Sequence, residues 1–354
     1  MRDPNNLDSS GKTVIIIGGG VAGMTAASRL ADLGEQVILI EQEEEIGGHL
    51  LNWDRLFPNR RPGYEVLDSL RDALTNSVEI RCSETVSTVI PQSSGFQVIL
   101  QSEESLFCDA LLLATGFDLF DATKKEEYGY GIYENVITSA DLEMMFRSGR
   151  PITTSRGKVP ERVGFVHCVG SRDEKVGNLY CSKVCCVTGV KQAIEIKEQL
   201  PQAELFGFYM DLRMYDRHFE EMYYEAQQKW DINFLRGRVS ECAENQDQSI
   251  VLKIEDTLTS RPLKITVDLL VLLVGFVPKP ETLRLASLLE IPVGDDRFLE
   301  PLDEHTRFNH TGRPGIFLAG TNKGPLTISN TIADASAAAI QLHHYLQTIN
   351  ETHP

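Results

Sequence analysis

The sequence of 354 residues lacks a hydrophobic run that could cross a membrane. Its apolar stretches, such as residues 14–17 and 267–277, have the length of strands, whereas a membrane helix needs about 20 apolar residues. The polar N-terminus, MRDPNNLDSSGK, also lacks the apolar core of a secretory signal. We therefore expect a cytoplasmic soluble protein without a membrane partner, whose residues 1–12 form a flexible tail.

Basic side chains are also scarce. The 34 Lys and Arg residues face 51 Asp and Glu residues, which gives a formal net charge of -17. Such a charge keeps a protein soluble and works against binding to nucleic acid or to anionic lipid, so no nucleic-acid partner is expected. The hydrophobic fraction of 42% is that of a folded protein, and the length allows two domains with sizeable cores.

The seven cysteines include no C-x2-C pair, and four of them fall in the stretch CVGSRDEKVGNLYCSKVCC at residues 168–186. An odd number of cysteines, unevenly clustered in a chain without an export signal, fits a disulfide framework poorly. Metal binding or redox chemistry fits this distribution better.

A glycine-rich motif follows the polar tail in TVIIIGGGVAGMTAASRLADLGEQVILIEQ. An apolar strand, a turn with Gly18, Gly20 and Gly23 in G-x-G-x-x-G spacing, a helix and a second strand form a βαβ unit. The three glycines permit the tight turn, the approach of a pyrophosphate and close helix packing, and the helix N-terminus favours the phosphate charge. Glu41, at the end of the second strand, stands where a carboxylate binds an adenosine ribose.

Further segments decide between NAD and FAD. EEEIGGHL after the acid, DALLLATGFD at 109–118 and RPGIFLAGT at 313–321 resemble, in this order, three segments of two-dinucleotide-binding flavoproteins. The resemblance implies FAD, although the usual ribitol-binding aspartate is replaced by Thr321. The residues predicted to bind FAD are Gly18, Gly20, Gly23, Glu41, Gly48, His49, Ala114, Thr115, Gly116, Gly320, Thr321, Thr327 and Ile328.

A helix over about 327–347 begins with cap residues and continues through alanines. Its N-terminal end could face the flavin and favour the anion formed on reduction, with a well-packed helix as the alternative. His49 could tune the properties of the flavin. His167 could hold its neighbour Cys168 in position from the outer shell of a metal site. Packing is the alternative for both histidines.

The middle of the chain predicts a second α/β domain. Strands are expected at 162–170, 203–211 and 232–239, with helices at 181–200 and 216–230. We therefore predict an FAD-binding domain of residues 13–118 and 265–350 and an inserted domain of residues 119–264. The inserted domain has no second glycine fingerprint, and the cysteine-rich stretch occupies the strand–helix junction where that fingerprint would lie.

The cysteines form a C-x12-C-x3-C-C pattern of Cys168, Cys181, Cys185 and Cys186. If the helix begins at Cys181, three thiols surround its start and Cys168 approaches from the strand. Four thiolates beside a helix N-terminus suit a four-iron–four-sulfur ([4Fe–4S]) cluster. A structural zinc ion, two disulfides and a redox dithiol remain alternatives. The spacing is less suitable for zinc and for the dithiol, and the expected cytoplasmic compartment disfavours disulfides.

HCVGSRDEKVGNLYCSKVCC, together with KKEEYGYGIYENVITS, FYMDLR, RGRVSE and LAGTNKGPLTISNT, is similar across nearly the whole chain to the flavin core of the A-type subunit of heterodisulfide reductase. This resemblance implies one FAD and one [4Fe–4S] cluster, with the four cysteines as ligands. It also assigns Lys191 to the flavin vicinity, although spacing alone suggests a solvated charge. A homodimer is a further expectation from the family.

The sequence lacks the C-x2-C-x2-C runs of the longer methanogen-type protein. It thus looks like the short A-type subunit of the heterodisulfide-reductase-like complex of sulfur oxidisers, which works with B- and C-type subunits and a lipoate-binding protein. We predict an electron-transfer flavoprotein subunit in cytoplasmic sulfur oxidation that does not bifurcate electrons. The alternatives are a stand-alone NAD(P)H-dependent disulfide or quinone reductase and a non-redox assembly subunit.

Overall fold

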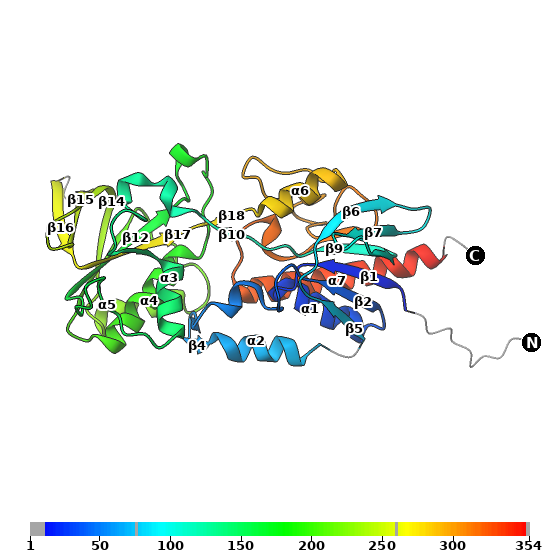
Figure 1. Ribbon diagram of the computed structural model, residues 1–354, viewed down its shortest axis with the longest axis horizontal. Coiled ribbons are helices and arrows are strands. Elements are labelled where there is room, and N and C mark those ends of the chain that lie inside the picture. Colours follow the sequence, from blue (N-terminus) through cyan, green and yellow to red (C-terminus); the bar gives the residue numbers. More distant parts are fainter. Residues whose placement is uncertain (1–10, 75–76, 259–260, 352–354) are drawn as a thin grey trace, which may run out of the picture. The chain divides into compact units, whose positions relative to one another are not determined.

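The computed structural model describes residues 11–74, 77–258 and 261–351, so most of the predicted flexible tail lies outside the described residues. The chain divides into two compact units (Figure 1). The first contains the described residues up to Leu51, Val66–Phe117 and the residues from Pro278 onward, and the second contains Asn52–Glu65 and Asp118–Val277. Each unit has its own sheet and hydrophobic core.

The described part of the first unit is built on a five-stranded parallel sheet in the order β19–β9–β1–β2–β5. Its strands are β1 (Thr13–Ile17), β2 (Gln36–Ile40), β5 (Val78–Arg81), β9 (Ala110–Leu113) and β19 (Ile316–Leu318). β1, β9 and β19 are apolar and almost wholly buried, as expected of parallel strands covered on both faces. β1 and β2 flank α1 (Val21–Asp32), so the predicted βαβ unit is present.

Helices and a smaller sheet cover this parallel sheet. The helices are α1, α2 (Gly63–Asp72), α6 (Pro280–Leu289) and α7 (Ile328–Glu351), and the antiparallel sheet contains β6 (Val86–Pro91), β7 (Phe96–Leu100) and β8 (Ser105–Cys108). α1 packs against β1, β2 and α7, and α6 packs against β6. Apolar residues of the parallel sheet, the small sheet and α6 form one buried cluster.

A seven-stranded sheet in the order β11–β17–β12–β13–β14–β15–β16 forms the centre of the second unit as described. Its strands are β11 (Val136–Thr138), β12 (Arg162–Val169), β13 (Glu204–Tyr209), β14 (Asn233–Glu244), β15 (Ile250–Asp256), β16 (Arg261–Val267) and β17 (Leu269–Val274). The pairs from β11 to β14 are parallel, and β14, β15 and β16 pair antiparallel.

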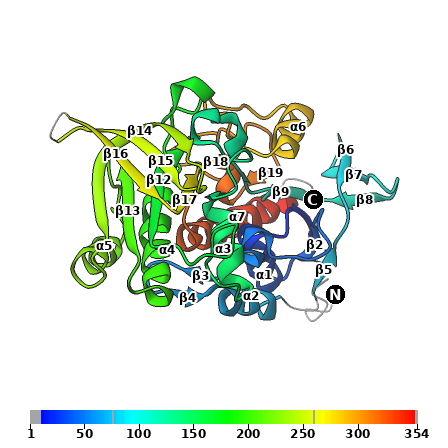
Figure 2. The same cartoon turned by 60° about the vertical axis from the view of Figure 1, so that its left-hand side comes forward.

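Helices α3 (Ser139–Arg147), α4 (Cys185–Gln199) and α5 (Phe219–Gln228) lie side by side on one face of this sheet (Figure 1 and Figure 2). α3 begins directly after β11 with a capping box, in which Thr138 accepts a hydrogen bond from the Asp141 amide and Asp141 accepts one from the Thr138 amide. Among the described residues, there is no helix with both the length and the apolar character needed to span a membrane.

Short elements complete both units. They are the strand pairs β3 (Arg55–Leu56) with β4 (Arg61–Pro62) and β10 (Asp118–Leu119) with β18 (Phe276–Val277), and the 3-10 helices η1 (Gly48–Leu51), η2 (Ala122–Lys124), η3 (Glu126–Tyr128), η4 (Glu174–Val176) and η5 (Gly320–Lys323). β3 and β4 belong to the second unit although they precede most of the first unit in sequence.

The division between units differs from the predicted domain boundaries at residues 265–277 and 52–65. The sequence predicts both stretches in the FAD-binding domain. However, the buried LLVLLV run of β17 pairs in parallel with β11 and β12 in the second unit. The 52–65 segment joins the same unit because Lys191 of α4 donates a hydrogen bond to the carbonyl oxygen of Arg55, at 2.9 Å.

The predicted start of the helix at Cys181 is wrong. α4 begins at Cys185, and Cys181 lies in the preceding loop. Lys183 adopts a left-handed conformation with φ +60°, which interrupts a helix, and the Ser182 side chain accepts a hydrogen bond from the Phe276 amide at 2.9 Å. Cys181 and Cys185 therefore do not share a helix face. The predicted strands at 162–170, 203–211 and 232–239 and the helix at 216–230 are confirmed with small differences in their ends.

Candidate functional site

The turn between β1 and α1 has the close contacts that its glycine spacing predicts. Gly18 has φ +111°, and a Cβ atom on Gly23 would lie 1.8 Å from the Gly18 carbonyl oxygen. A Cβ on Gly20 would meet nothing within 4 Å. The turn is therefore closed around Gly18 and Gly23 and open at Gly20, the position that a pyrophosphate would approach.

Glu41 and the second glycine pair lie against this turn. Glu41 is 7% exposed, and its carboxylate accepts hydrogen bonds from the amides of Gly19 at 2.7 Å and Glu43 at 3.0 Å. The Gly47 amide donates to the Gly19 carbonyl at 2.9 Å, and a Cβ on Gly48 would stand 3.2 Å from the Gly20 Cα. The segment that follows β2 thus meets the segment that follows β1.

His49 packs on Phe117. The two rings are stacked with centroids 4.3 Å apart, and His49 Nε2 lies 2.8 Å from the Phe117 carbonyl oxygen. This geometry supports the packing alternative for His49 and fixes the chain just beyond Gly116.

The ends of β9 and β19 bring the remaining predicted flavin residues to the same edge. Gly116 and Gly320 both have φ +78°, and a Cβ on Gly116 would be 3.9 Å from Thr321 Oγ1. A Cβ on Gly320 would lie 2.6 Å from Ala22 of α1, so this glycine permits the close approach of η5 to α1. Thr115 shares a hydrogen bond of 2.7 Å with Thr282, and Ala114 precedes it at the end of β9.

Thr327 is the cap of α7, as predicted, because its Oγ1 accepts a hydrogen bond from the Asn330 amide at 3.2 Å. Ile328 is the first residue of the helix. Carboxyl ends of parallel strands and the N-termini of the helices that follow them form the usual ligand edge of such sheets. The predicted flavin residues are thus gathered within the first unit, while their contact with FAD stays a prediction.

Asp334 of α7 is a residue that sequence reasoning missed. Its carboxylate accepts hydrogen bonds from the Gly320 amide at 2.6 Å, from Lys323 at 2.7 Å and from Asn309 at 2.9 Å. It holds the turn in which Thr321 replaces the usual aspartate. A signal was present, since Asp334 is an acid in the otherwise apolar and alanine-rich part of the helix.

In the second unit, the cysteines lie at the strand–helix junction between β12 and α4. Cys168 is near the end of β12 and has φ +62°, where the pairing of β12 with β17 shifts register. Cys181 is half-buried in the loop, and Cys185 and Cys186 are the first residues of α4. None of the four is in a disulfide.

The loop between Cys168 and Cys181 is held by its own polar contacts. Ser171 and Ser182 share a hydrogen bond of 2.5 Å, and Tyr180 donates to the Phe276 carbonyl at 2.8 Å. Asp173 forms an ion pair of 2.6 Å with the buried Lys125. The contacts of Ser171, Tyr180 and Ser182 thus hold both ends of the loop beside Phe276 of β18 without any bond between the thiols.

The four thiols influence one another electrostatically. Burial raises the pKa of Cys185 well above its usual value, and the neighbouring Cys168, Cys186 and Cys181 raise it further. Burial likewise raises the pKa of Cys168 to about 12, which the nearby Arg172 opposes. Arg172 is itself held by Asp211 at 2.7 Å. Among the described residues, however, no group of three or more His, Cys, Asp or Glu side chains is arranged to hold a metal ion.

His167 is buried beside Cys168, and burial lowers its pKa to about 3, so the ring is neutral. A Cβ added to Gly189 of α4 or to Gly207 of β13 would lie 3.3 Å or 3.6 Å from its Nε2 atom. The ring therefore fills the space between α4 and β13, which supports the packing alternative for this histidine.

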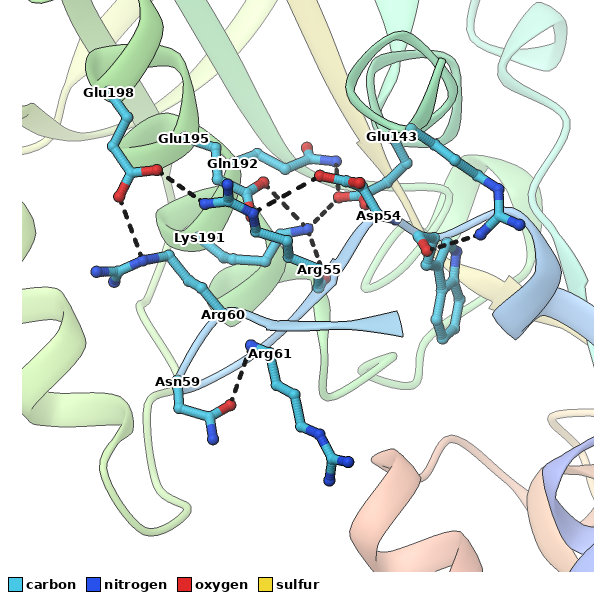
Figure 3. A network of polar contacts seen from close by, with 12 residues as sticks. Asp54, Arg55, Asn59, Arg60, Arg61, Glu143, Lys191, Gln192, Glu195 and Glu198 are labelled. Carbon is cyan, nitrogen blue, oxygen red and sulfur yellow. Dashed lines mark hydrogen bonds and ion pairs between the residues drawn. The ribbon is translucent and has the colours of Figure 1, made fainter. Parts of the chain in front are cut away.

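Spacing alone suggested that Lys191 is a solvated charge. The structure shows instead that its side chain is buried and only 2% exposed. Its ammonium donates to the Arg55 carbonyl and to Glu143, and it lies 3.3 Å from Glu195 Oε2 (Figure 3). Gln192 donates to the same Glu143 oxygen at 2.8 Å. The spacing of residues in the sequence could not reveal this cluster, because its members come from three separate elements, α3, α4 and β3. The flavin-linked role of Lys191 stays a prediction.

Glu195 is 3% exposed, and burial raises its pKa to about 7. The neighbouring Glu143 raises this pKa as well, whereas Lys191 and Arg55 lower it. In the part of the chain that the structure describes, neither Glu195 oxygen has a hydrogen-bond partner. The cluster therefore contains a carboxyl group that changes its charge near neutral pH.

Comparisons with known proteins first define a class. Residues 12–143 match the family described as pyridine nucleotide-disulphide oxidoreductase. The fold is similar to thioredoxin reductase of Lactococcus lactis, with a TM-score of 0.66 and 18% identity over 95% of this chain and 99% of that one. Thioredoxin reductase of T. acidophilum gives 0.64 and 17% over 94% and 98%. The predicted thioredoxin-reductase-like architecture is confirmed.

The particular relatives come from one kind of complex. The chain is 30% identical to the A-type iron-sulfur subunit of CoB–CoM heterodisulfide reductase from Methanocaldococcus jannaschii, over 95% of this chain and 64% of the relative. It is 31% identical to the A-type subunit of the H2:CoB-CoM heterodisulfide,ferredoxin reductase from Methanothermobacter thermautotrophicus, over 92% and 62%. Curated homologues of this chain are thus A-type subunits of heterodisulfide reductase, as the resemblance predicted, and the chain spans less than two thirds of their length.

The glycine contacts predict a large loss of stability for one of two similar substitutions and a small loss for the other. Gly23→Ala should lower the free energy of unfolding by about 2 kcal/mol or more, because its methyl group would collide with a main-chain oxygen. Gly20→Ala has open space and should cost less than about 1 kcal/mol. Urea unfolding of the cofactor-free proteins measures both values. Equal losses in the two variants would contradict the described turn.

The raised pKa of Glu195 predicts that the stability of the folded protein depends on pH. The folded-state pKa of Glu195, about 7, exceeds its usual value of 4.5, so folding favours the protonated form. The contribution of protonated Glu195 to the free energy of unfolding is fully present below about pH 4.5. It is lost as the pH rises through 7, by up to about 3 kcal/mol. Glu195→Gln should remove this loss and be more stable than wild type above pH 7.

Urea unfolding at several pH values checks this expectation. Glu204→Gln, which changes an exposed carboxylate at the start of β13, serves as the matched control and should keep the wild-type profile. Parallel pH profiles for Glu195→Gln and wild type would show that Glu195 does not titrate in this window.

Proposed function

We propose that the chain is an electron-transfer flavoprotein subunit of a heterodisulfide-reductase-like complex, with FAD on the first unit and a [4Fe–4S] cluster on the second. One observation carries the proposal. The first unit keeps the glycine turn of a dinucleotide site, whereas the corresponding strand–helix junction of the second unit carries four thiols that are not in disulfides.

FAD is supported by the family match, by the thioredoxin-reductase-like fold and by the ligand edge of the first unit. The α1 N-terminus with Gly18 and Gly20 would hold the pyrophosphate, and Glu41 would hold the ribose. The start of α7 at Thr327 and Ile328 would face the flavin. When bound, FAD can exchange electrons both in pairs and singly, which allows it to connect the two kinds of carrier.

The residues at the second junction fit an iron–sulfur cluster by their chemistry. Iron–sulfur clusters take four cysteine thiolates, and Cys168, Cys181, Cys185 and Cys186 lie within electrostatic range of one another. The α4 N-terminus and Arg172 both favour the negative charge of thiolates. Since no single-ion site is formed by the described residues, the support is the donor set itself and the names of the homologues.

The setting of the reaction is part of the proposal. Homologue names support membership of a heterodisulfide reductase complex. The resemblance to the short A-type subunit favours cytoplasmic sulfur oxidation without bifurcation, B- and C-type partner subunits, a lipoate-binding protein and a homodimer. A stand-alone NAD(P)H-dependent reductase has less support, because the second junction lacks a glycine fingerprint. Rapid flavin reduction by NADH in stopped flow would favour that alternative.

Replacement of one cysteine tests the cluster. Cys185→Ser should lower the iron and acid-labile sulfide content and weaken the low-temperature EPR signal of the reduced protein, because one of four ligands is lost. Flavin content should stay unchanged, since the predicted FAD residues belong to the other unit. Electron transfer from the reduced protein to a one-electron acceptor should fall at least about tenfold.

The matched control is Cys242→Ser in β14, which should keep the wild-type iron content. Unchanged iron, sulfide and EPR signal in Cys185→Ser would exclude this residue as a ligand. Loss of the cluster with undiminished electron transfer would instead favour a non-redox role in assembly.

Replacement at Gly20 tests the flavin site. Gly20→Ala should reduce the flavin content of the purified protein at least about tenfold, because a methyl group would occupy the space that a pyrophosphate needs. Its circular dichroism should match wild type, since no protein atom is displaced. Absorbance of the released flavin after denaturation gives the content, and full occupancy in the variant would contradict the proposed position of the pyrophosphate.

A further inference from the structure

One arginine, Arg172, interacts with the group of thiols in the second unit. Burial raises the pKa of Cys168 and of Cys186, and Arg172 opposes both shifts. Cys168 stands near the end of β12 and Cys186 at the start of α4, so a guanidinium that acts on both belongs to the junction itself. Burial lowers the pKa of Arg172, but Asp211 and Cys168 raise it overall, so the guanidinium stays charged.

One donor atom of this guanidinium is buried without a partner. The Arg172 side chain is 21% exposed, and its Nη2 atom donates to the Asp211 carboxylate at 2.7 Å. Its Nη1 atom, in contrast, is buried and donates to no group among the residues that the structure describes. Folded proteins seldom keep such a donor without a ligand or a water molecule. Nη1 therefore remains available to an acceptor that binds at the junction.

The main chain holds Arg172 in a conformation that residues with side chains rarely adopt. Its φ of +53° lies in the left-handed region. Its amide donates to the Tyr180 carbonyl at 2.9 Å, and the next residue, Asp173, exchanges two main-chain hydrogen bonds with Asn178. Such a conformation persists only where the surrounding contacts require it. The start of the side chain is thus fixed, and little freedom is lost when its donor binds an acceptor.

Asp211 determines the charge around this guanidinium. Its carboxylate accepts the hydrogen bond from Arg172 and lies 3.5 Å from Nη2 of Arg236. Its main-chain carbonyl oxygen accepts a hydrogen bond from the Cys186 thiol at 3.7 Å. Arg236 is 48% exposed, so Arg172 is the buried and Arg236 the solvated partner of one carboxylate. The thiols therefore interact with a cation whose charge Asp211 partly compensates.

We propose that Arg172 sets the reduction potential of the iron–sulfur cluster, because its charge and its unpartnered Nη1 donor stabilise the reduced form. The inference rests on the proposed function, which assigns the cluster to the four cysteines. Reduction adds one electron, breaks no bond and moves no proton, so it adds one negative charge to a group that is already anionic. The potential of such clusters depends on net charge and on hydrogen bonds to their sulfur atoms, and Arg172 can contribute to both.

The two charges of the Arg172–Asp211 pair act in opposite directions. A fixed cation beside the thiolates favours the more negative, reduced form and raises the potential. The Asp211 carboxylate favours the oxidised form and lowers the potential. Because Arg172 is mostly buried, water and salt screen its charge weakly, whereas they screen the half-exposed Arg236 more strongly.

Two variants with opposite expected shifts test the proposal. Arg172→Gln should lower the equilibrium constant for uptake of one electron about tenfold, which moves the midpoint potential by about 59 mV to more negative values. Asp211→Asn should move it to more positive values, because the asparagine oxygen still accepts the hydrogen bond from Arg172 while the negative charge is gone. Redox titration of the anaerobically purified proteins, monitored by EPR, gives these potentials.

Arg236→Gln is the matched control. It removes the same charge from the exposed partner of the same carboxylate, and it should move the potential by less than about half of the Arg172→Gln shift. Arg172→Lys keeps the charge but not the planar set of donors, so its potential should lie between those of wild type and Arg172→Gln. Iron, acid-labile sulfide and flavin assays show whether all the proteins carry the same cofactors.

Equal potentials of wild type and Arg172→Gln at full iron and sulfide content would overturn the proposal. Shifts of the same sign in Arg172→Gln and Asp211→Asn would also overturn it, since they would reflect a general disturbance of the loop. If Arg172→Gln does not keep its cluster, unchanged potentials in both Arg172→Lys and Asp211→Asn would overturn it instead.

A failure of the proposed function gives a different result. Purified wild type without acid-labile sulfide would contradict the assignment of the cluster to the cysteines, and the sulfide assay reveals this before any potential is measured. A wild type with a full cluster and a potential that does not respond to Arg172 would leave the proposed function intact and exclude only the role of Arg172. The two failures are therefore distinguishable.

Discussion

The constraint on which the structure depends is that parallel strands bring their carboxyl ends to one edge of a sheet. In the first unit this edge joins the segments that follow β1, β2, β9 and β19, and the contact between Gly18 and Gly23 lets α1 approach closely enough to close it. In the second unit the same constraint places the ends of β12 and β17 together. The loop that carries the cysteines is held by hydrogen bonds of Ser182 and Tyr180 to the main chain of Phe276 in β18, which follows β17. Both candidate sites are consequences of strand order.

The local parts of this arrangement could be predicted from the sequence. The turn from Gly18 to Gly23, the acid at Glu41 and the cap at Thr327 depend on residues near one another in the chain, and their types and spacing have few other uses. Most strands and helices of the second unit were also predicted, since their apolar patterns are regular. The four cysteines were recognised as a group because they share one short stretch.

Long-range contacts set the limit of prediction. α4 begins at Cys185 because Ser182 is held by the amide of Phe276 in β18, almost a hundred residues away in sequence. β17 joins the second unit by pairing with β11 and β12, which an apolar run alone does not reveal. Lys191 is buried because the 52–65 segment and α3 supply its partners. None of these contacts has a signal within its own stretch of sequence.

Together the two units suggest a division of chemistry. The first provides a glycine-lined edge suited to a dinucleotide, and the second provides a group of thiols suited to single-electron transfer. The most direct test of this account is the cofactor content of the wild-type chain after anaerobic purification. The account predicts one flavin with about four irons and four acid-labile sulfides per chain. Zinc without sulfide at the cysteines would contradict it.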